Sequence, residues 1–94
     1  MLKTLEDLVN LIRERKSSSD ETSYTSKLLK DKSLSVEKVK EEIGELIEAV
    51  DNNSNKIHEA ADVLYHLLVY LEGNGVRIED IMDELEKRKK KKES

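Results

Sequence analysis

Residues 36–50 read VEKVKEEIGELIEAV, and residues 56–72 read KIHEAADVLYHLLVYLE. In the first stretch the apolar side chains recur every three or four residues, as on one face of a helix: Val36, Val39, Ile43, Leu46, Ile47 and Val50. The second stretch is apolar almost all round, so we expect it to be a buried helix. The two stretches predict helices over about 35–51, with Ser35 as N-cap, and about 56–72, joined by a turn at 51–55.

The rest of the chain predicts two or three more helices. Residues 2–15 have helical apolar spacing, and a polar loop at 17–20 separates them from a possible short helix at 23–30. The glycines of 73–75 end the fourth helix, and a last amphipathic helix begins near Ile78. Because no stretch alternates as a strand does, we predict an all-α fold of four or five helices.

Composition restricts the class of protein further. The chain has 94 residues, 40% of them charged, with no cysteine and no proline. Without cysteine there is no disulfide scaffold, no thiolate zinc site and no cysteine nucleophile. The sequence shows no signal peptide or membrane span, so we expect a cytoplasmic protein. A chain this short buries a modest core, so we expect a homodimer or a larger homo-oligomer to complete the helical bundle.

The charges are unevenly distributed. Residues 87–92 are six consecutive cations, whereas residues 1–86 carry eleven basic and twenty acidic side chains. An acidic body repels nucleic-acid phosphates, so we expect no nucleic-acid partner and favour a metal-dependent site for a phosphorylated small molecule. We read the cationic run as a frayed, solvated helix end; anion binding is the alternative.

Carboxylates interrupt the apolar helix at 56–72. Glu59, Asp62 and His66 share its one polar strip. Burial of an ionised carboxylate costs several kcal/mol unless a cation compensates for it. A bound metal ion would supply that compensation.

The helix at 35–51 carries a second acidic cluster, made of Glu41, Glu42, Glu45 and Glu48. Like charges three or four residues apart destabilise a helix, so the cluster either binds a cation or forms a solvated face paired with Lys38 and Lys40. Ligands that are all carboxylate oxygens select Mg²⁺, with Mn²⁺ as a substitute. A di-iron bundle would need Glu-x-x-His where this chain has Glu59-x-x-Asp62.

Glu41-Glu42-Ile43-Gly44-Glu45, thirteen further residues and then Glu59-Ala60-Ala61-Asp62 resemble the E-E-x-x-E and E-x-x-D signature of the all-α nucleotide pyrophosphohydrolases related to MazG. Three segments, 23–28, 38–45 and 59–68, are similar to the phosphoribosyl-ATP pyrophosphohydrolase family within that group. The resemblance covers about residues 4–88. One departure is Lys40, where members of the family often have glycine.

The resemblance implies a fold, an activity and a set of site residues. It implies a MazG-like helical bundle at 1–88 followed by a basic tail at 89–94. The activity would be Mg²⁺-dependent hydrolysis of phosphoribosyl-ATP to phosphoribosyl-AMP and pyrophosphate, the second step of histidine biosynthesis. The implied metal ligands are Glu42, Glu45, Glu59 and Asp62. Glu41 and Glu45 would act in catalysis, with Glu41 as a further ligand or as the residue that orients or deprotonates the attacking water.

The expected substrate contacts are Ser23, Thr25, Lys27, Lys38 and His66. Alternatives remain for two of these groups: residues 23–27 could be an ordinary helix start with a solvated lysine, and His66 a hydrogen-bonded core residue. Tyr65 is expected to pack in the core and His58 to lie on the surface. A fused cyclohydrolase would need cysteines for zinc, so we expect the stand-alone form of the enzyme.

The sequence is also compatible with two other functions. One is a house-cleaning nucleoside triphosphate pyrophosphohydrolase of the same superfamily, with the same metal chemistry and a different substrate. The other is a non-catalytic helical dimerisation module whose acidic face only keeps it in solution. The second alternative predicts no Mg²⁺-dependent activity.

Overall fold

The computed structural model describes residues 2–18 and 22–93, with side chains through residue 90. These residues form five helices and no strand, which confirms the all-α prediction. The helices are α1 (Lys3–Ser17), α2 (Tyr24–Lys30), α3 (Lys32–Asn52), α4 (Lys56–Gly73) and α5 (Ile78–Glu93). Part of the loop predicted at 17–20 lies outside the described residues.

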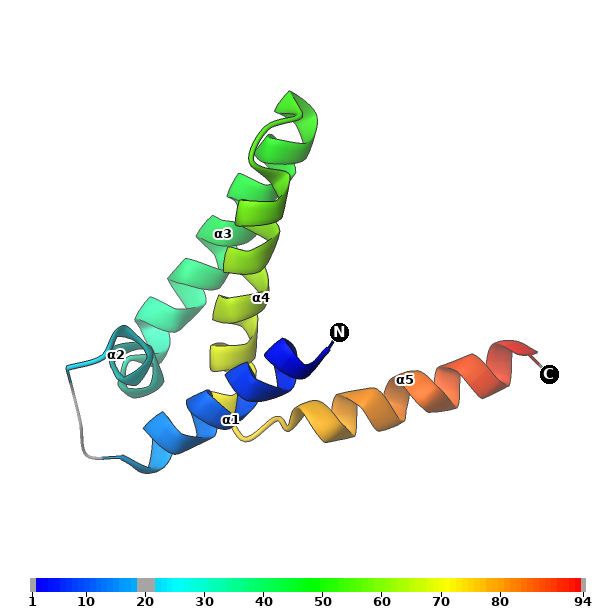
Figure 1. Ribbon diagram of the computed structural model, residues 1–94, viewed down its shortest axis with the longest axis horizontal. Helices are drawn as coiled ribbons and strands as arrows, with labels where there is room; N and C mark the ends of the chain where they lie inside the picture. The colour runs from blue at the N-terminus through cyan, green and yellow to red at the C-terminus, as the bar shows by residue number, and fades with distance from the viewer. Residues whose placement is uncertain (1, 19–21, 94) are drawn as a thin grey trace.

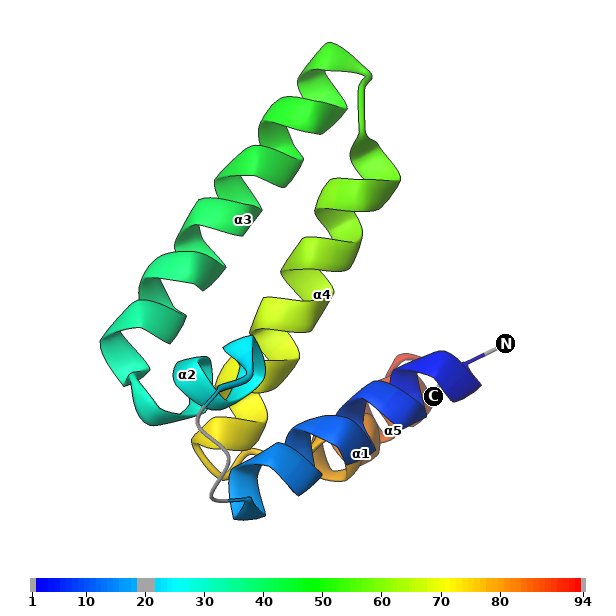
Figure 2. The ribbon, with the colours of Figure 1, turned by 60° about the vertical axis from the view of Figure 1, so that its left-hand side comes forward.

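Helices α3 and α4 form a long antiparallel hairpin, and α2 lies across the end of the hairpin opposite its turn (Figure 1). Helices α1 and α5 lie side by side in both views and form a second arm, beyond which α5 continues alone (Figure 2). The hairpin and this arm diverge as a V. The two longest helices therefore contact each other along their length, while α5 is covered only near its beginning.

Asp31 is the N-cap of α3, four residues before the predicted cap. Its side chain accepts a hydrogen bond from the backbone N–H of Leu34 at 3.1 Å and so caps the helix. The prediction that Ser35 is the N-cap is therefore wrong: Ser35 is buried one turn inside α3. The periodicity of the apolar residues does not locate this cap.

The turn between α3 and α4 uses two left-handed asparagines. Asn53 has φ 52° and Asn55 has φ 51°, a conformation that asparagine tolerates better than most residues. The backbone N–H of Ser54 donates to the carbonyl of Ala49 at 2.9 Å and closes the end of α3. This short turn sets the antiparallel pairing of the two helices that carry the acidic clusters.

The core lies where α1, α2 and α4 meet. Its buried residues are Val9, Ile12, Leu28, Leu68 and Val69. Each fully buried aliphatic side chain of this size contributes about 1.5–3 kcal/mol relative to an exposed one. The hairpin beyond this core is held mainly by the contact between α3 and α4.

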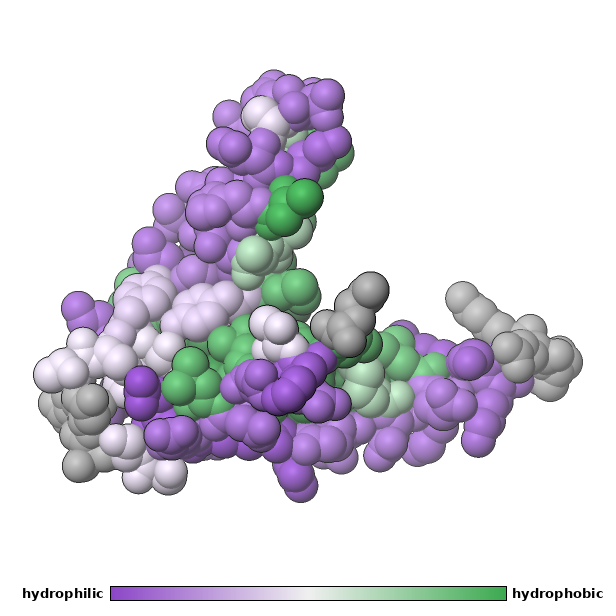
Figure 3. Space-filling view, viewed as in Figure 1, coloured by the Kyte–Doolittle hydropathy of each residue, from purple (hydrophilic) through white to green (hydrophobic). Residues whose placement is uncertain are grey.

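Helix α4 is not buried on all sides in the single chain. Ile57 is 88% exposed and Leu64 53%, and Ile47 on α3 is 58% exposed. The prediction that α4 is fully buried is therefore wrong for the single chain. The other helices leave one apolar face of the α3–α4 hairpin exposed. Figure 3 shows apolar surface along the edge of the hairpin that borders the inside of the V, continuing onto α1.

Helix α5 begins at Ile78 as predicted, but it does not fade at the cationic run. It stays helical to Glu93, and the side chains described at 87–90 are exposed. None of the described helices is long and apolar enough to cross a membrane.

An arginine fixes the point where α1, α4 and α5 meet. Arg13 Nε and Nη2 donate to the two carboxylate oxygens of Glu72 at 2.9 and 3.0 Å, and its Nη1 donates to Glu79 at 2.9 Å. Glu72 also accepts the backbone N–H of Ile78, the first residue of α5. The guanidinium hydrogen bond lowers the pKa of Glu72, and it lowers the pKa of Glu79 to about 2. We call these three charged side chains the arginine junction.

Candidate metal centre

Three glutamates from two helices meet in the hairpin. Glu42 and Glu45 lie three residues apart on α3, which places them on neighbouring positions of one face. Glu59 comes from the first turn of α4. One carboxylate oxygen from each of the three lies within 4.8 Å of the others. The pairing of α3 with α4 therefore brings both acidic clusters of the sequence to one place.

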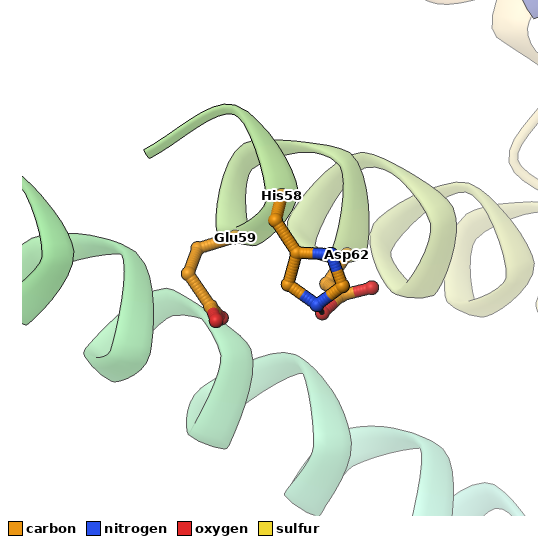
Figure 4. Close-up of side chains that lie close together, drawn as sticks. All are labelled: His58, Glu59 and Asp62. Carbon is orange, nitrogen blue, oxygen red and sulfur yellow. Dashed lines mark ion pairs between the residues drawn. The ribbon is translucent and has the colours of Figure 1, made fainter. Parts of the chain in front are cut away.

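Asp62 extends this group along α4. Asp62, Glu59 and His58 form a second set whose ligand atoms also lie within 4.8 Å of one another, and Glu59 belongs to both sets. Figure 4 shows His58 beside Asp62 and the carboxylate of Glu59 extending toward the neighbouring helix. We call Glu42, Glu45, Glu59 and Asp62 the carboxylate site.

From the sequence, His58 was expected only to lie on the surface. It is 72% exposed, as expected, yet its Nε2 lies 3.4 Å from a carboxylate oxygen of Asp62. The two residues are four apart on a helix, and that spacing was the available signal. His58 is thus a neighbour of the site at its open side.

The basic side chain beside the carboxylate site is His58, which lies next to Asp62. Glu42 is 8% exposed, and among the described residues neither its Oε2 nor the Oε2 of Glu59 has a hydrogen-bond partner. Burial raises the pKa of Glu42 and of Glu59, and the negative charge of Glu45 raises both further. Buried, unpaired carboxylates that repel one another fit a hard divalent cation, since such an ion supplies both the missing charge and the missing partner.

A polar hollow adjoins the site on the side of the turn. It has a volume of about 280 Å³. Its lining residues are Glu45, Glu48, Ala49, Asn52, Ser54, Asn55 and Glu59. Oxygen-rich lining of this kind suits a hydrated cation better than an apolar ligand. Glu48 of the predicted acidic cluster therefore borders the hollow and lies outside both ligand sets.

Glu41 takes a different partner. It is exposed, and it forms an ion pair with Lys38 at 3.4 Å, one turn earlier on α3. This hydrogen bond raises the pKa of Lys38. The alternative of a solvated face paired with lysine therefore describes Glu41, whereas Glu42 and Glu45 turn toward α4.

Helix α2 borders the same part of α4. The hydroxyl of Tyr24 lies 2.9 Å from His66 Nε2, and His66 Nδ1 lies 2.8 Å from the backbone carbonyl of Asp62. Thr25 shares a hydrogen bond with the hydroxyl of Tyr65. Both ring nitrogens of His66 thus have protein partners, as the core alternative for this residue expected.

The other predicted substrate contacts lie around the start of α2. Ser23 is the N-cap of the helix, since its Oγ accepts from the backbone N–H of Ser26 at 3.0 Å. Thr25 is buried, while Lys27 is exposed. The structure thus gives Ser23 and Thr25 partners within the protein and leaves Lys27 at the surface; their roles toward a substrate stay predictions.

Comparison with known proteins gives one consistent result. Residues 5–89 match the family described as phosphoribosyl-ATP pyrophosphohydrolase. The chain is 46% identical to a phosphoribosyl-ATP pyrophosphatase of Methylobacterium nodulans, over 90% of this chain and 82% of that one. It is 42% identical to a protein of the same name from Clostridium novyi, over 93% of this chain and 82% of the relative.

A longer protein also contains a similar segment. The chain is 40% identical to the histidine biosynthesis bifunctional protein HisIE of Pyrococcus furiosus, over 95% of this chain but only 43% of that protein. No solved structure matches the chain.

Proposed function

The chain belongs to the phosphoribosyl-ATP pyrophosphohydrolase family, and from this premise we propose that it hydrolyses phosphoribosyl-ATP to phosphoribosyl-AMP and pyrophosphate, a step of histidine biosynthesis. The observation that carries the proposal is the pair of buried carboxylate oxygens on Glu42 and Glu59 that have no partner among the described residues. A purely structural acidic face would be solvated instead.

We further propose that the carboxylate site holds Mg²⁺, or Mn²⁺ in its place. Glu42, Glu45 and Glu59 supply the converging oxygens, and Asp62 supplies a further ligand beside them. When bound, the ion would offset the charge of the triphosphate and lower the pKa of a coordinated water. Carboxylates repel phosphate, so binding of the substrate beside them needs this added positive charge.

Glu41 and Lys38 lie at the margin of the carboxylate site. Their charges would act on the attacking water and on a phosphate of the substrate. The exposed carboxylate of Glu41 can accept a proton from the water that attacks the α–β phosphoanhydride, and the ammonium of Lys38 can donate to a phosphate oxygen. Attack forms one phosphorus–oxygen bond and breaks another, and the pyrophosphate leaves with the electrons of the broken bond. The ion pair of the two residues at 3.4 Å keeps both side chains at this edge.

We also propose that a second copy covers the apolar face of the hairpin. Its large exposed side chains are Ile43, Ile47, Val50, Ile57 and Leu64. Their burial would supply the core that a chain of this size lacks. Sedimentation should therefore show a dimer or larger assembly, and Ile47→Glu should shift it toward the monomer; a wild-type monomer would contradict this proposal.

Pyrophosphate release tests the proposed reaction directly. The full chain is incubated with phosphoribosyl-ATP, ATP, dUTP and dCTP, each with and without Mg²⁺. We expect Mg²⁺-dependent release from phosphoribosyl-ATP and much less from the other three. Release from the ordinary nucleotides alone would indicate the house-cleaning activity, and no release from any of them would favour the non-catalytic module.

A further inference from the structure

Tyr24 is an aromatic side chain held in place without being buried. It is 45% exposed. Its ring lies nearly parallel to that of Tyr65, with centroids 6.2 Å apart, and edge-on to His66 at 5.8 Å. A ring with two aromatic neighbours and a bonded hydroxyl has little freedom to rotate. Its exposed surface is therefore presented in a fixed orientation.

The hydrogen bonds of His66 show what the hydroxyl of Tyr24 does. The carbonyl of Asp62 can only accept, so His66 Nδ1 must carry the proton that it donates there. In the neutral ring Nε2 is then an acceptor, and the hydroxyl of Tyr24 donates to it at 2.9 Å. This hydroxyl is thus used within the protein, and what Tyr24 offers to a ligand is its ring.

The ring of Tyr24 lies beside the charged groups of the proposed reaction. Burial raises the pKa of Tyr24, and the nearby charges that act on it are those of Lys38, Glu42 and Glu41. His66, which holds the hydroxyl, bonds the backbone of Asp62. Tyr24 therefore stands at the edge of the carboxylate site where Lys38 could meet a phosphate, about where the rest of a nucleotide would extend.

From this geometry we propose that the ring of Tyr24 is the surface on which the purine base of the nucleotide stacks, with its orientation fixed by His66 and Tyr65. The proposal rests on the proposed function and adds a base-recognition residue to it. Every base has an aromatic face, and stacking on an aromatic side chain is a common way to bind one. The carboxylate site and Lys38 would engage the phosphates, and Tyr24 the base.

Calorimetry with two probes separates base recognition from phosphate recognition. AMP and ribose 5-phosphate share the sugar phosphate, and only AMP has the base. In the presence of Mg²⁺, the wild type should bind AMP more tightly than ribose 5-phosphate. Tyr24→Leu should weaken AMP binding by roughly 5- to 100-fold and leave ribose 5-phosphate binding within about twofold. Tyr24→Phe keeps the ring and should retain most of the affinity for AMP.

The matched control is Tyr70→Leu, which removes a tyrosine of α4 that is not one of the ring neighbours given for Tyr24. It should leave the ratio of the two affinities unchanged. Equal binding of AMP and ribose 5-phosphate by the wild type would overturn the proposal without any variant. Equal loss of both ligands in Tyr24→Leu would also overturn it, because the contribution of Tyr24 would then not depend on the base.

A second test uses the absence of tryptophan from the chain. Tyr24→Trp introduces a single indole, whose fluorescence a stacked base should quench. We expect AMP to quench it and ribose 5-phosphate to leave it unchanged; quenching by both or by neither would contradict stacking. Neither test requires turnover, so base stacking can fail while phosphoribosyl-ATP is hydrolysed, and it can hold where hydrolysis is absent.

Discussion

The carboxylate site and the arginine junction lie toward opposite ends of α4, and both are built from glutamates. At the junction, the guanidinium of Arg13 bonds Glu72 and Glu79 and lowers the pKa of each. At the carboxylate site the pKa values of Glu42 and Glu59 are raised, because burial and the charge of Glu45 outweigh the opposing charges of His66 and His58. An acidic cluster that is neutralised by its own arginine is part of the fold. A cluster whose buried carboxylate oxygens have no hydrogen-bond partner among the described residues is suited to bind a cation from solution.

The largest expected effect comes from neutralising the carboxylate site. Glu45→Gln or Asp62→Asn should lower the rate of turnover by at least about 100-fold, because each removes a proposed metal ligand. Circular dichroism should show the helical content unchanged. In the absence of Mg²⁺ the Glu45→Gln protein should be at least as stable as the wild type, since repulsion of Glu42 and Glu59 is relieved.

The matched control is Glu37→Gln, an exposed glutamate on the same helix. It should retain wild-type turnover. Unchanged turnover in both Glu45→Gln and Asp62→Asn would remove the metal assignment and end the contrast between the two clusters.

The next largest effect is a loss of stability at the arginine junction. Arg13→Met leaves Glu72, whose side chain is 5% exposed, without its cation. The free energy of unfolding, measured with urea, should fall by about 3 kcal/mol, the usual result when one partner of a buried ion pair is removed. Arg15→Met is the control, and it should cost less than about 1 kcal/mol because Arg15 lies only within 4.0 Å of the exposed Glu14.

A double variant sharpens this prediction. Arg13→Met with Glu72→Leu removes both charges and should recover much of the lost stability. If the double variant is as unstable as Arg13→Met alone, the loss comes from packing of the arginine side chain and not from an unpaired carboxylate.

The pH dependence of stability should run in opposite directions at the two clusters. The pKa of Glu79 is about 2 in the folded protein, below its ordinary value of 4.5. The stabilisation from its bond to Arg13 is therefore present above pH 4.5 and lost as the pH falls toward 2. Glu42 and Glu59 have raised pKa values. Without metal, their contribution to the free energy of unfolding is therefore largest at low pH and declines as the pH rises through those pKa values.

Urea unfolding of the metal-free protein at several pH values measures both trends. The deficit of Arg13→Met relative to the wild type should shrink below pH 4.5. An advantage of Glu42→Gln over the wild type should be greatest at neutral pH and should also shrink on acidification. A deficit of Arg13→Met that stays constant down to pH 2 would contradict the ion-pair account of the junction.

The smallest expected effect is at Gly44, which lies between Glu42 and Glu45 on α3. A Cβ built there meets nothing within 4 Å in the single chain. Gly44→Ala should therefore raise the stability of α3 by about 1 kcal/mol through helix propensity alone. Thermal unfolding measures the gain, and Ala49→Gly, at a buried position of the same helix, should act in the opposite direction. A loss of stability together with dissociation of the assembly would place Gly44 in contact with a second copy.

Local patterns predicted most of the fold. The predicted helix at 56–72 and the predicted helix start at Ile78 agree with α4 and α5 within one residue. Apolar periodicity and glycine at a helix end are local signals, which can be read from each segment alone. The cap at Asp31 was missed for the opposite reason: several polar side chains compete there, and the choice depends on which backbone N–H groups each one reaches.

The candidate site was predictable to the same extent. Glu42 and Glu45 share a face by their spacing, and a short turn returns Glu59 to them. The bond between Arg13 and Glu72 joins residues 59 positions apart and leaves no periodic signal. The exposure of Leu64 was likewise beyond sequence reasoning, because apolar periodicity marks a face that must be covered and does not identify what covers it.

The whole carboxylate site belongs to one hairpin, between the start of α3 and the end of α4. Its most distant members in the sequence, Glu42 and Asp62, are joined by a single tight turn. Contacts of such short sequence separation form early when a chain folds, since they close only a small loop. The proposed metal centre is therefore modular: a designer could graft the two helices and their turn onto another helical scaffold and carry its four carboxylates with them.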